Sequence, residues 1–244
     1  MIIIPAIDLK EGLCVRLLQG NFAQVTVYSD NPVEIASQWR SQGAERIHVV
    51  DLDGSLAGAP RNREVIRDIV DAVDVPIQVG GGIRDMNTVE TYLNMGVQWV
   101  ILGTMALRDR PFVAQACRTF NERIILGIDA KDGEIAVQGW TEQTSASVME
   151  TAKSYEGFGL AALVYTDIKR DGMETGVNVE ATRSLAEAVN IPIIASGGVS
   201  GMSDIERLLE IETSGVIGVI VGKALYTRAI SLQGAIEISR KFRE

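Results

Sequence analysis

Short, almost uninterrupted runs of apolar residues alternate along the whole chain with longer segments in which apolar residues recur every three or four positions. The short runs are rich in valine and isoleucine, which is typical of parallel strands covered by helices on their outer face. The segments between them are too long for hairpins and suit right-handed strand–helix–strand crossovers. The runs predict strands at Ile2–Ile7, Arg46–Asp51, Ile77–Val79, Trp99–Leu102, Ile124–Ile128, Ala162–Tyr165, Ile193–Ala195 and Gly218–Val221. The periodic segments predict helices at Pro32–Gln42, Arg63–Ala72, Met86–Met95, Arg110–Phe120, Ser145–Phe158, Val179–Val189, Ser203–Ile211 and Ser231–Phe242.

Three segments of the first half of the chain recur in the same order in the second half. The pairs are Ile4–Gly12 with Ile125–Gly133, Val75–Leu93 with Ile191–Leu209, and Val100–Leu107 with Val219–Tyr226. Their offsets are 121, 116 and 119 residues, close to half of the 244-residue chain. Such an internal repeat indicates a duplicated unit. The sequence therefore predicts one α/β domain, a (β/α)8 or TIM barrel, made of two fused (βα)4 half-barrels at roughly residues 1–122 and 123–244.

Each predicted half places an aspartate at the end of its first strand, Asp8 in one half and Asp129 in the other. Side chains at the carboxyl ends of barrel strands face the active site, and the first and fifth strands of a ring of eight lie opposite each other. The residues after each aspartate are extended, so there is no helix for either carboxylate to cap. Neither aspartate has a partner at metal-ligand spacing. We therefore predict an acid–base pair that faces across the mouth of the barrel.

Glycine-rich turns follow the third and fourth strands of each half. Glycine allows backbone N–H groups to approach an anion closely, and a following helix adds the positive end of its dipole. Glycines of ordinary tight turns are the alternative, but the duplication favours two phosphate sites and a substrate with a phosphate at each end. The predicted binding residues are Gly81, Gly82, Gly103 and Thr104 in the first half, and Gly197, Gly198, Gly222 and Lys223 in the second.

Composition narrows the class of protein. Apolar residues make up 46% of the chain, enough for a large core, and the net charge of −9 argues against binding to nucleic acid or anionic membranes. Cys14 and Cys117 are not in ligand spacing and are expected to be buried thiols in a reducing compartment. The N-terminus does not resemble a signal peptide, and no apolar stretch approaches the ~20 residues of a membrane span. We expect a cytoplasmic monomer.

Five motifs resemble those of one enzyme family over nearly the whole chain. They are Ile47–Gly54, Val79–Arg84, Gln138–Trp140, Tyr165–Met173 and Ala195–Ser200. The family is the histidine-biosynthesis isomerase family, which converts N'-(5'-phosphoribosylformimino)-5-aminoimidazole-4-carboxamide ribonucleotide (ProFAR) to its ribulosyl isomer (PRFAR). The resemblance implies an Amadori rearrangement, from aminoaldose to aminoketose, without metal or cofactor. It makes Asp129 the general acid that opens the ribose ring and Asp8 the general base that removes the C2 proton.

Three further residues have both a functional and a structural interpretation. Thr166 resembles the family's hydroxyl that hydrogen-bonds a catalytic carboxylate or the substrate, but threonine is also common in strands. Trp140 could stack on the imidazole-carboxamide ring or pack on the surface. Arg16 could pair with a phosphate or the carboxamide, or could be a solvated loop residue.

Two residues of the second predicted strand, Asp51 and His48, also have two possible interpretations each. Asp51 could orient Asp8 or Lys10 and help to bind the substrate, or it could cap a turn. His48, the only histidine, is interpreted as a core residue with a satisfied ring, with an inward-facing position as the alternative. The stretches 16–31, 139–145 and 168–178 are longer than usual strand–helix loops and are predicted to be lids.

Three other functions fit parts of the sequence. The sister cyclase of imidazole glycerol phosphate synthase shares the half-barrel repeat and both aspartates, but it typically has Lys-Gly where this chain has Gln19-Gly20, and a serine within Tyr165–Asp167. A bifunctional isomerase would also act on phosphoribosylanthranilate. A non-catalytic phosphosugar-binding barrel would keep the glycines but would not need both aspartates.

Overall fold

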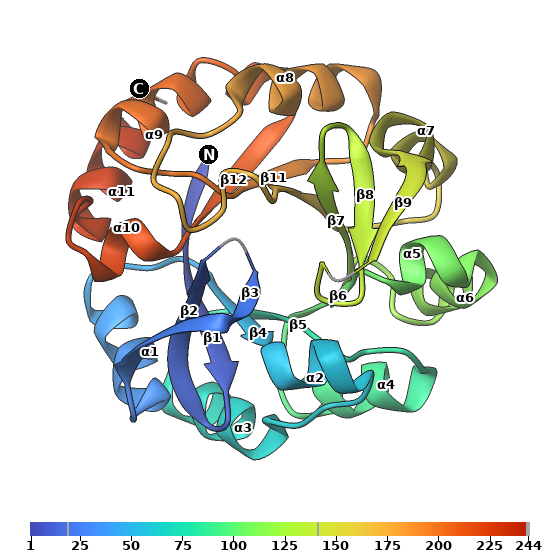
Figure 1. The fold of residues 1–244 in the computed structure, drawn as a ribbon, viewed down its shortest axis with the longest axis horizontal. Helices are drawn as coiled ribbons and strands as arrows, with labels where there is room; N and C mark the ends of the chain where they lie inside the picture. Colours follow the sequence, from blue (N-terminus) through green and yellow to red (C-terminus); the bar gives the residue numbers. More distant parts are fainter. Residues whose placement is uncertain (19, 141, 243–244) are drawn as a thin grey trace.

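The strands form a closed ring, as the repeat predicted. A computed structural model describes residues 1–18, 20–140 and 142–242, and within them eight parallel strands form a barrel (Figure 1). β7 pairs with β10 and thereby closes the ring. The ring strands, in order, are β1 (Ile2–Lys10), β4 (Ile47–Asp51), β5 (Ile77–Gly80), β6 (Trp99–Leu102), β7 (Ile124–Lys131), β10 (Ala162–Asp167), β11 (Ile193–Ser196) and β12 (Val216–Val221). The fold class and all eight predicted barrel strands are confirmed.

The helices surround the ring on its outside. The predicted helices correspond to α1 (Pro32–Ser41), α3 (Arg63–Ala72), α4 (Met86–Asn94), α6 (Arg110–Thr119), α7 (Val148–Ser154), α8 (Val179–Ala188), α9 (Met202–Leu209) and α11 (Leu232–Lys241). The bounds of one helix were wrong at both ends, because α7 begins at Val148 and not at Ser145, and it ends at Ser154 and not at Phe158. The Ser147 side chain accepts a hydrogen bond from the Glu150 amide and so caps α7, and the residues before it form a strand. The structure adds short helices that have too few turns to show a period: α2 (Leu52–Ala57), α5 (Met105–Arg108) and α10 (Lys223–Tyr226), with a 3-10 turn at Glu212–Ser214.

Each half also carries an antiparallel hairpin on the active face, which the sequence analysis described only as extended or looped segments. β1 continues into β2 (Leu13–Leu18) and β3 (Asn21–Ser29), and β7 continues into β8 (Glu134–Val137) and β9 (Glu142–Ser147). The first turns are Glu11-Gly12 and Asp132-Gly133, and all four residues have positive φ angles. Two such residues in succession define a type I′ turn, for which Asp-Gly is a strong sequence signal. The two hairpins stand on opposite sides of the barrel mouth (Figure 1).

The apolar residues form two cores. The larger one fills the space between the ring and the helices, and the smaller one fills the barrel interior. The interior residues are Ile4, Ala6, Ile101, Ile125, Ala162, Val164, Ile194 and Ile220. Cys14 and Cys117 are both free thiols buried in the structure, as predicted. Within the described part of the chain, no helix combines the length and apolar character needed to cross a membrane.

Gly81 shows how tightly the loops after the barrel strands are packed. It has a φ of +107°, and a Cβ atom placed on it would lie 2.2 Å from the carbonyl oxygen of Asp51. Gly157 has a φ of +76° but nothing within 4 Å of the same position. The equivalent residue of the second half, Gly197, also has a positive φ and a close backbone neighbour, the carbonyl of Asp167 at 2.7 Å.

We therefore predict unequal effects for Gly81→Ala and Gly157→Ala. Both substitutions place an L side chain in the left-handed region, at a cost of about 1–2 kcal/mol, but only the first also forces a backbone clash. Gly81→Ala should lower the free energy of unfolding, measured by chemical denaturation, by at least about 2 kcal/mol more than Gly157→Ala does. Equal effects of the two substitutions would contradict this packing.

Candidate active site

One cavity opens at the carboxyl ends of the barrel strands and connects both predicted phosphate sites with both aspartates. It is lined by Asp8, Arg16, His48, Gly81, Gly82, Arg84, Gly103, Thr104, Asp129, Trp140, Thr166, Asp171, Gly197, Gly198, Gly222 and Lys223, among others. The structure therefore brings together every predicted site residue except Asp51. Among the described residues, no group of three or more histidine, cysteine, aspartate or glutamate side chains is arranged to hold a metal ion.

Asp8 is paired with Arg16. The Nη1 atom of Arg16 donates to the Asp8 carboxylate at 2.7 Å, and Nη2 donates to the Ala6 carbonyl at 2.7 Å. The guanidinium also lies 5.3 Å from the centre of the Tyr226 ring. Burial raises the pKa of Asp8, while the charge and hydrogen bond of Arg16 oppose that rise. The interpretation of Arg16 as a solvated loop residue was wrong, because β2 directs its side chain into the cavity beside Asp8.

Asp129 has neutral partners in place of a cation. The hydroxyl of Thr166 and the indole N–H of Trp140 hydrogen-bond its carboxylate, and both oppose the rise in its pKa that burial causes. Thr166 lies directly beside Asp129 in the register of β7 and β10. In the first half, the corresponding neighbour of Asp8 is Val50, which has no hydroxyl. The two duplicated aspartates therefore have different surroundings.

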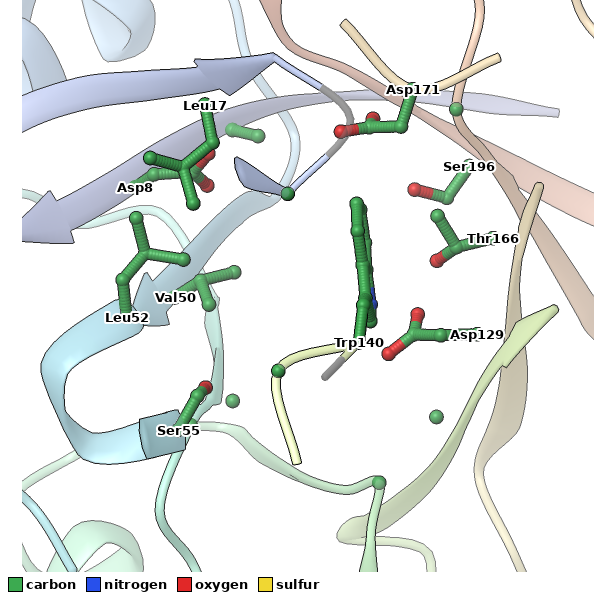
Figure 2. A pocket seen from close by; sticks show the side chains of 18 of the residues that line it. Asp8, Leu17, Val50, Leu52, Ser55, Asp129, Trp140, Thr166, Asp171 and Ser196 are labelled. Atoms are coloured by element: carbon green, nitrogen blue, oxygen red, sulfur yellow. The ribbon is translucent and has the colours of Figure 1, made fainter. Parts of the chain in front are cut away.

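Trp140 lies inside the cavity and not on the surface. Figure 2 shows its ring standing between Asp8 on one side and Asp129 and Thr166 on the other. Its face also covers Gly20, where a Cβ atom would lie 2.1 Å from Cε3 of the indole. Trp140 thus links the turn of one hairpin with the turn of the other. Gln19, the residue before Gly20, stands where the sister cyclase typically has a lysine, and it lies outside the described residues.

Asp171 is a third aspartate that lines the cavity, and it was not among the predicted site residues. It belongs to the loop after β10, which was predicted only as a lid, and Figure 2 shows it above Trp140 on the Thr166 side. Burial raises its pKa to about 7, and the charges of Asp8 and Asp129 contribute, although Arg16 opposes the rise. The sequence did contain one signal for Asp171, because the long loop after β10 carries Arg170-Asp171-Gly172 on the active face. The internal repeat did not single out this aspartate, since the first half has no matching one.

The two glycine turns have nearly the same construction. A Cβ atom on Gly82 would lie 2.6 Å from the Gly54 carbonyl, and one on Gly198 would lie 2.6 Å from the Gly176 carbonyl. A short helix begins beside each turn: α5 starts directly after Gly103-Thr104, and α10 starts directly after Gly222. These three residues also line the cavity. Asp85 caps α4, the helix that follows the first turn, by accepting from the Thr88 amide at 2.7 Å, and the contribution of the α4 dipole stays a prediction.

Asp51 has a structural position. Its carboxylate accepts hydrogen bonds from the backbone amides of Gly54, Arg61 and Asn62 and from the Asn62 side chain, at 2.7–2.9 Å. It is fully buried, and it caps α2. In the second half, Asp167 accepts from the Asn178 side chain at 2.8 Å in the same way. The structure thus supports the capping interpretation of Asp51, with no contact to Asp8 or Lys10 recorded among the described residues.

Comparison with known proteins agrees with this geometry. The sequence model of a family described as "Histidine biosynthesis protein" matches residues 2–231. The chain belongs to this histidine biosynthesis family. A family relative from Syntrophus aciditrophicus is 63% identical over 240 residues, which cover 98% of this chain and 99% of the relative. Relatives from Geobacter sulfurreducens and Trichlorobacter lovleyi are 57% and 56% identical over 241 residues each, covering 99% of this chain and 99% and 98% of their own lengths.

These three family members carry the same name, 1-(5-phosphoribosyl)-5-((5-phosphoribosylamino)methylideneamino)imidazole-4-carboxamide isomerase. The name describes enzymes that isomerise ProFAR. The predicted membership of the histidine-biosynthesis isomerase family is therefore confirmed.

The raised pKa of Asp171 makes the stability of the fold depend on pH. The folded protein holds this proton up to about pH 7, whereas an unfolded aspartate releases it near 3.8, so stability falls as pH rises between these values. Asp171→Asn cannot ionise. The variant should therefore be more stable than the parent at pH 8, by up to about 4 kcal/mol, with almost no difference near pH 4.

A control of opposite sign is available in Asp74, which is exposed and forms an ion pair with Arg40 that lowers its pKa to about 2. Asp74→Asn should slightly destabilise the protein at neutral pH. Urea unfolding at both pH values measures these changes. An Asp171→Asn variant that is less stable than the parent at pH 8 would show that Asp171 is ionised at little cost.

Proposed function

We propose that this chain isomerises ProFAR to PRFAR by an Amadori rearrangement. The observation that carries the proposal is the pair of carboxylates, Asp8 and Asp129, on opposite strands of one cavity whose rim holds two matching glycine turns. A substrate with a phosphate at each end fits such a rim, because each turn directs backbone N–H groups to one end of the ligand. The sugar that reacts would then lie between the two carboxylates.

The two phosphate sites supply positioning. The net charge of the protein is −9, so a bisphosphorylated substrate is attracted by local groups and not by the overall field. Lys223 at the second site and Arg84 at the first both line the cavity and supply positive charge there. Lys223 donates to the Gly172 carbonyl at 2.9 Å, which connects the second site to the loop that carries Asp171. Fixing both ends of the substrate holds its reacting carbon in the orientation that proton transfer needs.

The surroundings of the aspartates support a division of roles. A hydrogen bond from the charged Arg16 favours an ionised carboxylate more than neutral donors do, so Asp8 suits the base that removes the C2 proton. Asp129 has the neutral donors Thr166 and Trp140 and takes a proton more readily, which suits the acid that protonates the ribose ring oxygen. Thr166 would orient Asp129 toward that oxygen.

Asp171 is a second candidate for the acid. Its pKa of about 7 leaves it protonated in a large fraction of molecules at neutral pH, which is the condition that a general acid must meet. Its loop also contacts Lys223 and so could respond to a bound phosphate. The indole of Trp140 stands between the two aspartates in the structure, so substrate binding requires it to move or to stack on the imidazole-carboxamide ring.

A turnover assay tests the proposed reaction. Purified protein should convert ProFAR to PRFAR in the absence of ammonia and of a glutaminase, and the reaction can be followed by absorbance. Asp8→Asn should reduce kcat by at least about 10²-fold while the substrate still binds, since the base is lost and the phosphate sites remain. Asp74→Asn, whose side chain is exposed and lies outside the cavity, should leave turnover unchanged.

Three outcomes separate the alternatives. Turnover of PRFAR, but not of ProFAR, with added ammonia would point to the cyclase. Turnover of phosphoribosylanthranilate in addition to ProFAR would show a bifunctional isomerase. Activity of Asp8→Asn within threefold of the parent would refute the role of Asp8 as base.

The pH dependence of kcat/KM distinguishes the two candidate acids. A general acid must be protonated, so activity falls as pH rises through its pKa, and a general base must be ionised, so activity falls as pH drops through its own. If Asp171 is the acid, the alkaline limb should lie near pH 7 in the parent and should disappear in Asp171→Asn. If Asp129 is the acid, Asp129→Asn should remove that limb and Asp171→Asn should only shift it. An alkaline limb that survives unchanged in both variants would exclude both assignments.

A further inference from the structure

Four large polar or aromatic side chains interrupt the apolar interior of the barrel in the first half only. His48, Gln78 and Trp99 lie side by side in the register of β4, β5 and β6, and Arg46 lies two residues before His48. We call these four residues the interior polar cluster. The repeat places Ala162, Val164, Ile194 and Gly218 at the matching positions of the second half.

The second half therefore acts as a built-in control. It forms the same strands and the same ring closure with apolar or small residues at these positions, so the scaffold does not need polar groups there. Burying polar groups inside an apolar core is unfavourable unless they are hydrogen-bonded. Gln78 is completely buried, and burial lowers the pKa of Arg46 to about 10. A polar cluster that is tolerated only because its members are hydrogen-bonded to one another, and that the fold can do without, indicates a function.

The hydrogen bonds within the cluster have a fixed direction. Arg46 has only N–H donors, and its Nη1 atom lies 3.3 Å from the Oε1 atom of Gln78, so this oxygen is the acceptor. The guanidinium of Arg46 is held over the Trp99 ring at 3.7 Å from its centre. The other end of the Gln78 amide, Nε2, must then donate, and it lies 2.9 Å from Nδ1 of His48.

This direction determines the state of the histidine ring. Nδ1 of His48 accepts the hydrogen bond from Gln78, so it carries no proton, and a neutral ring then has its proton on Nε2. Burial and the nearby charge of Arg16 lower the pKa of His48 to about 3, which is consistent with a neutral ring. Arg16 has only donors, so it cannot accept the Nε2 proton. Among the described residues, the ring has no second hydrogen-bond partner recorded.

His48 is also the point at which the cluster meets the active-site cavity, because its side chain lines that cavity. In the register of β1 and β4, His48 lies beside Ala6, two residues below the level of Asp8. The Ala6 carbonyl is the group that anchors Arg16, the partner of Asp8. We therefore infer that the Nε2–H donor of His48 is available to a ligand at the bottom of the cavity, on the side of Asp8.

We propose that His48 is a catalytic residue that donates its Nε2–H hydrogen bond to the oxygen on C2 of the substrate sugar, with Gln78 and Arg46 as positioning residues that fix its tautomer. The proposal rests on the proposed isomerase function. The base Asp8 removes the proton from C2 of the ring-opened Schiff base, and the electrons of the broken C–H bond pass to the iminium nitrogen and give an enolamine. Asp8 then returns this proton to C1, and the C2 hydroxyl gives its own proton to the general acid, which lost one when the ring opened. Negative charge develops on the C2 oxygen as it becomes the carbonyl of the ketose, and a fixed neutral donor stabilises that charge. No proton leaves His48 in this step.

The tautomer can be measured directly in the intact protein. His48 is the only histidine of the chain, so protein labelled with 15N-histidine gives the nitrogen signals of this ring alone. We expect a protonated Nε2 and an unprotonated Nδ1 that do not change between about pH 5 and 9, outside the range in which an ordinary histidine titrates. Addition of PRFAR should shift the Nε2 and Nε2–H signals more than the Nδ1 signal. A protonated Nδ1, or a ring that titrates near pH 6.5, would overturn the proposal.

Substitutions that copy the second half into the first test the catalytic role. His48→Val introduces the residue that the repeat has at this position, and it should lower kcat for ProFAR by about 10²-fold while KM changes by less than threefold. His48→Gln keeps a neutral N–H donor at the same distance from the backbone and should be at least about tenfold faster than His48→Val. Gln78→Glu replaces the donor by an acceptor and should move the proton to Nδ1 in the 15N spectrum.

The kinetic results and the 15N spectrum test separate parts of the proposal. Folded His48→Val with kcat within threefold of the parent would overturn the catalytic role, and equal rates for His48→Val and His48→Gln would show that a donor is not required. If His48→Val does not fold, the tautomer of the parent and its response to PRFAR still decide the proposal. A parent protein that does not turn over ProFAR would refute the proposed function, while the ring spectrum would separately report whether His48 presents the donor.

Discussion

Closure of the barrel is the constraint on which the other features depend. Pairing of β7 with β10 and of β12 with β1 brings eight strand ends to one mouth, and this places Asp8 and Asp129 on opposite sides of it. Because side chains alternate between the two faces of a strand, a slip of one residue in either pairing would turn a carboxylate toward the helices. The hairpins that extend β1 and β7 resist such a slip, since Asp8 and Asp129 are also paired with Val15 and Ala136 on their second edges.

Closure also concentrates like charges. Three aspartates share one cavity, and burial raises the pKa of each of them. Arg16 alone cannot neutralise three carboxylates, and it is bonded to Asp8. Protonation of at least one other carboxyl group is then favoured, which is the condition that the proposed pair of acid and base requires. The proposed acid–base chemistry would thus follow from enclosing three aspartates with Arg16 as the cation beside them, while Arg84 and Lys223, which also line the cavity, belong to the proposed phosphate sites.

The sequence was sufficient for the parts that repeat. Apolar runs predicted the ring strands, and the duplication predicted the opposed aspartates and both glycine turns, because each of these signals occurs twice. It was insufficient where contacts cross between the hairpins, as for Trp140 against Gly20, and where a loop residue such as Asp171 becomes buried only after the barrel closes. The hairpins themselves were missed, although Asp132-Gly133 had the sequence of a type I′ turn.

The comparison of the two halves separates binding from chemistry. The glycine turns and the capping pairs Asp51–Asn62 and Asp167–Asn178 are alike in both halves, as the proposed substrate with a phosphate group at each end would require. Residues near the reacting centre differ: Arg16 corresponds to Val137, Thr166 to Val50, and His48 to Val164. A reaction that removes a proton on one side and delivers one on the other needs unlike groups on its two sides. Polar residues that break the internal symmetry of a duplicated barrel are therefore the ones to examine for chemistry, and the residues that keep it are the ones to examine for binding.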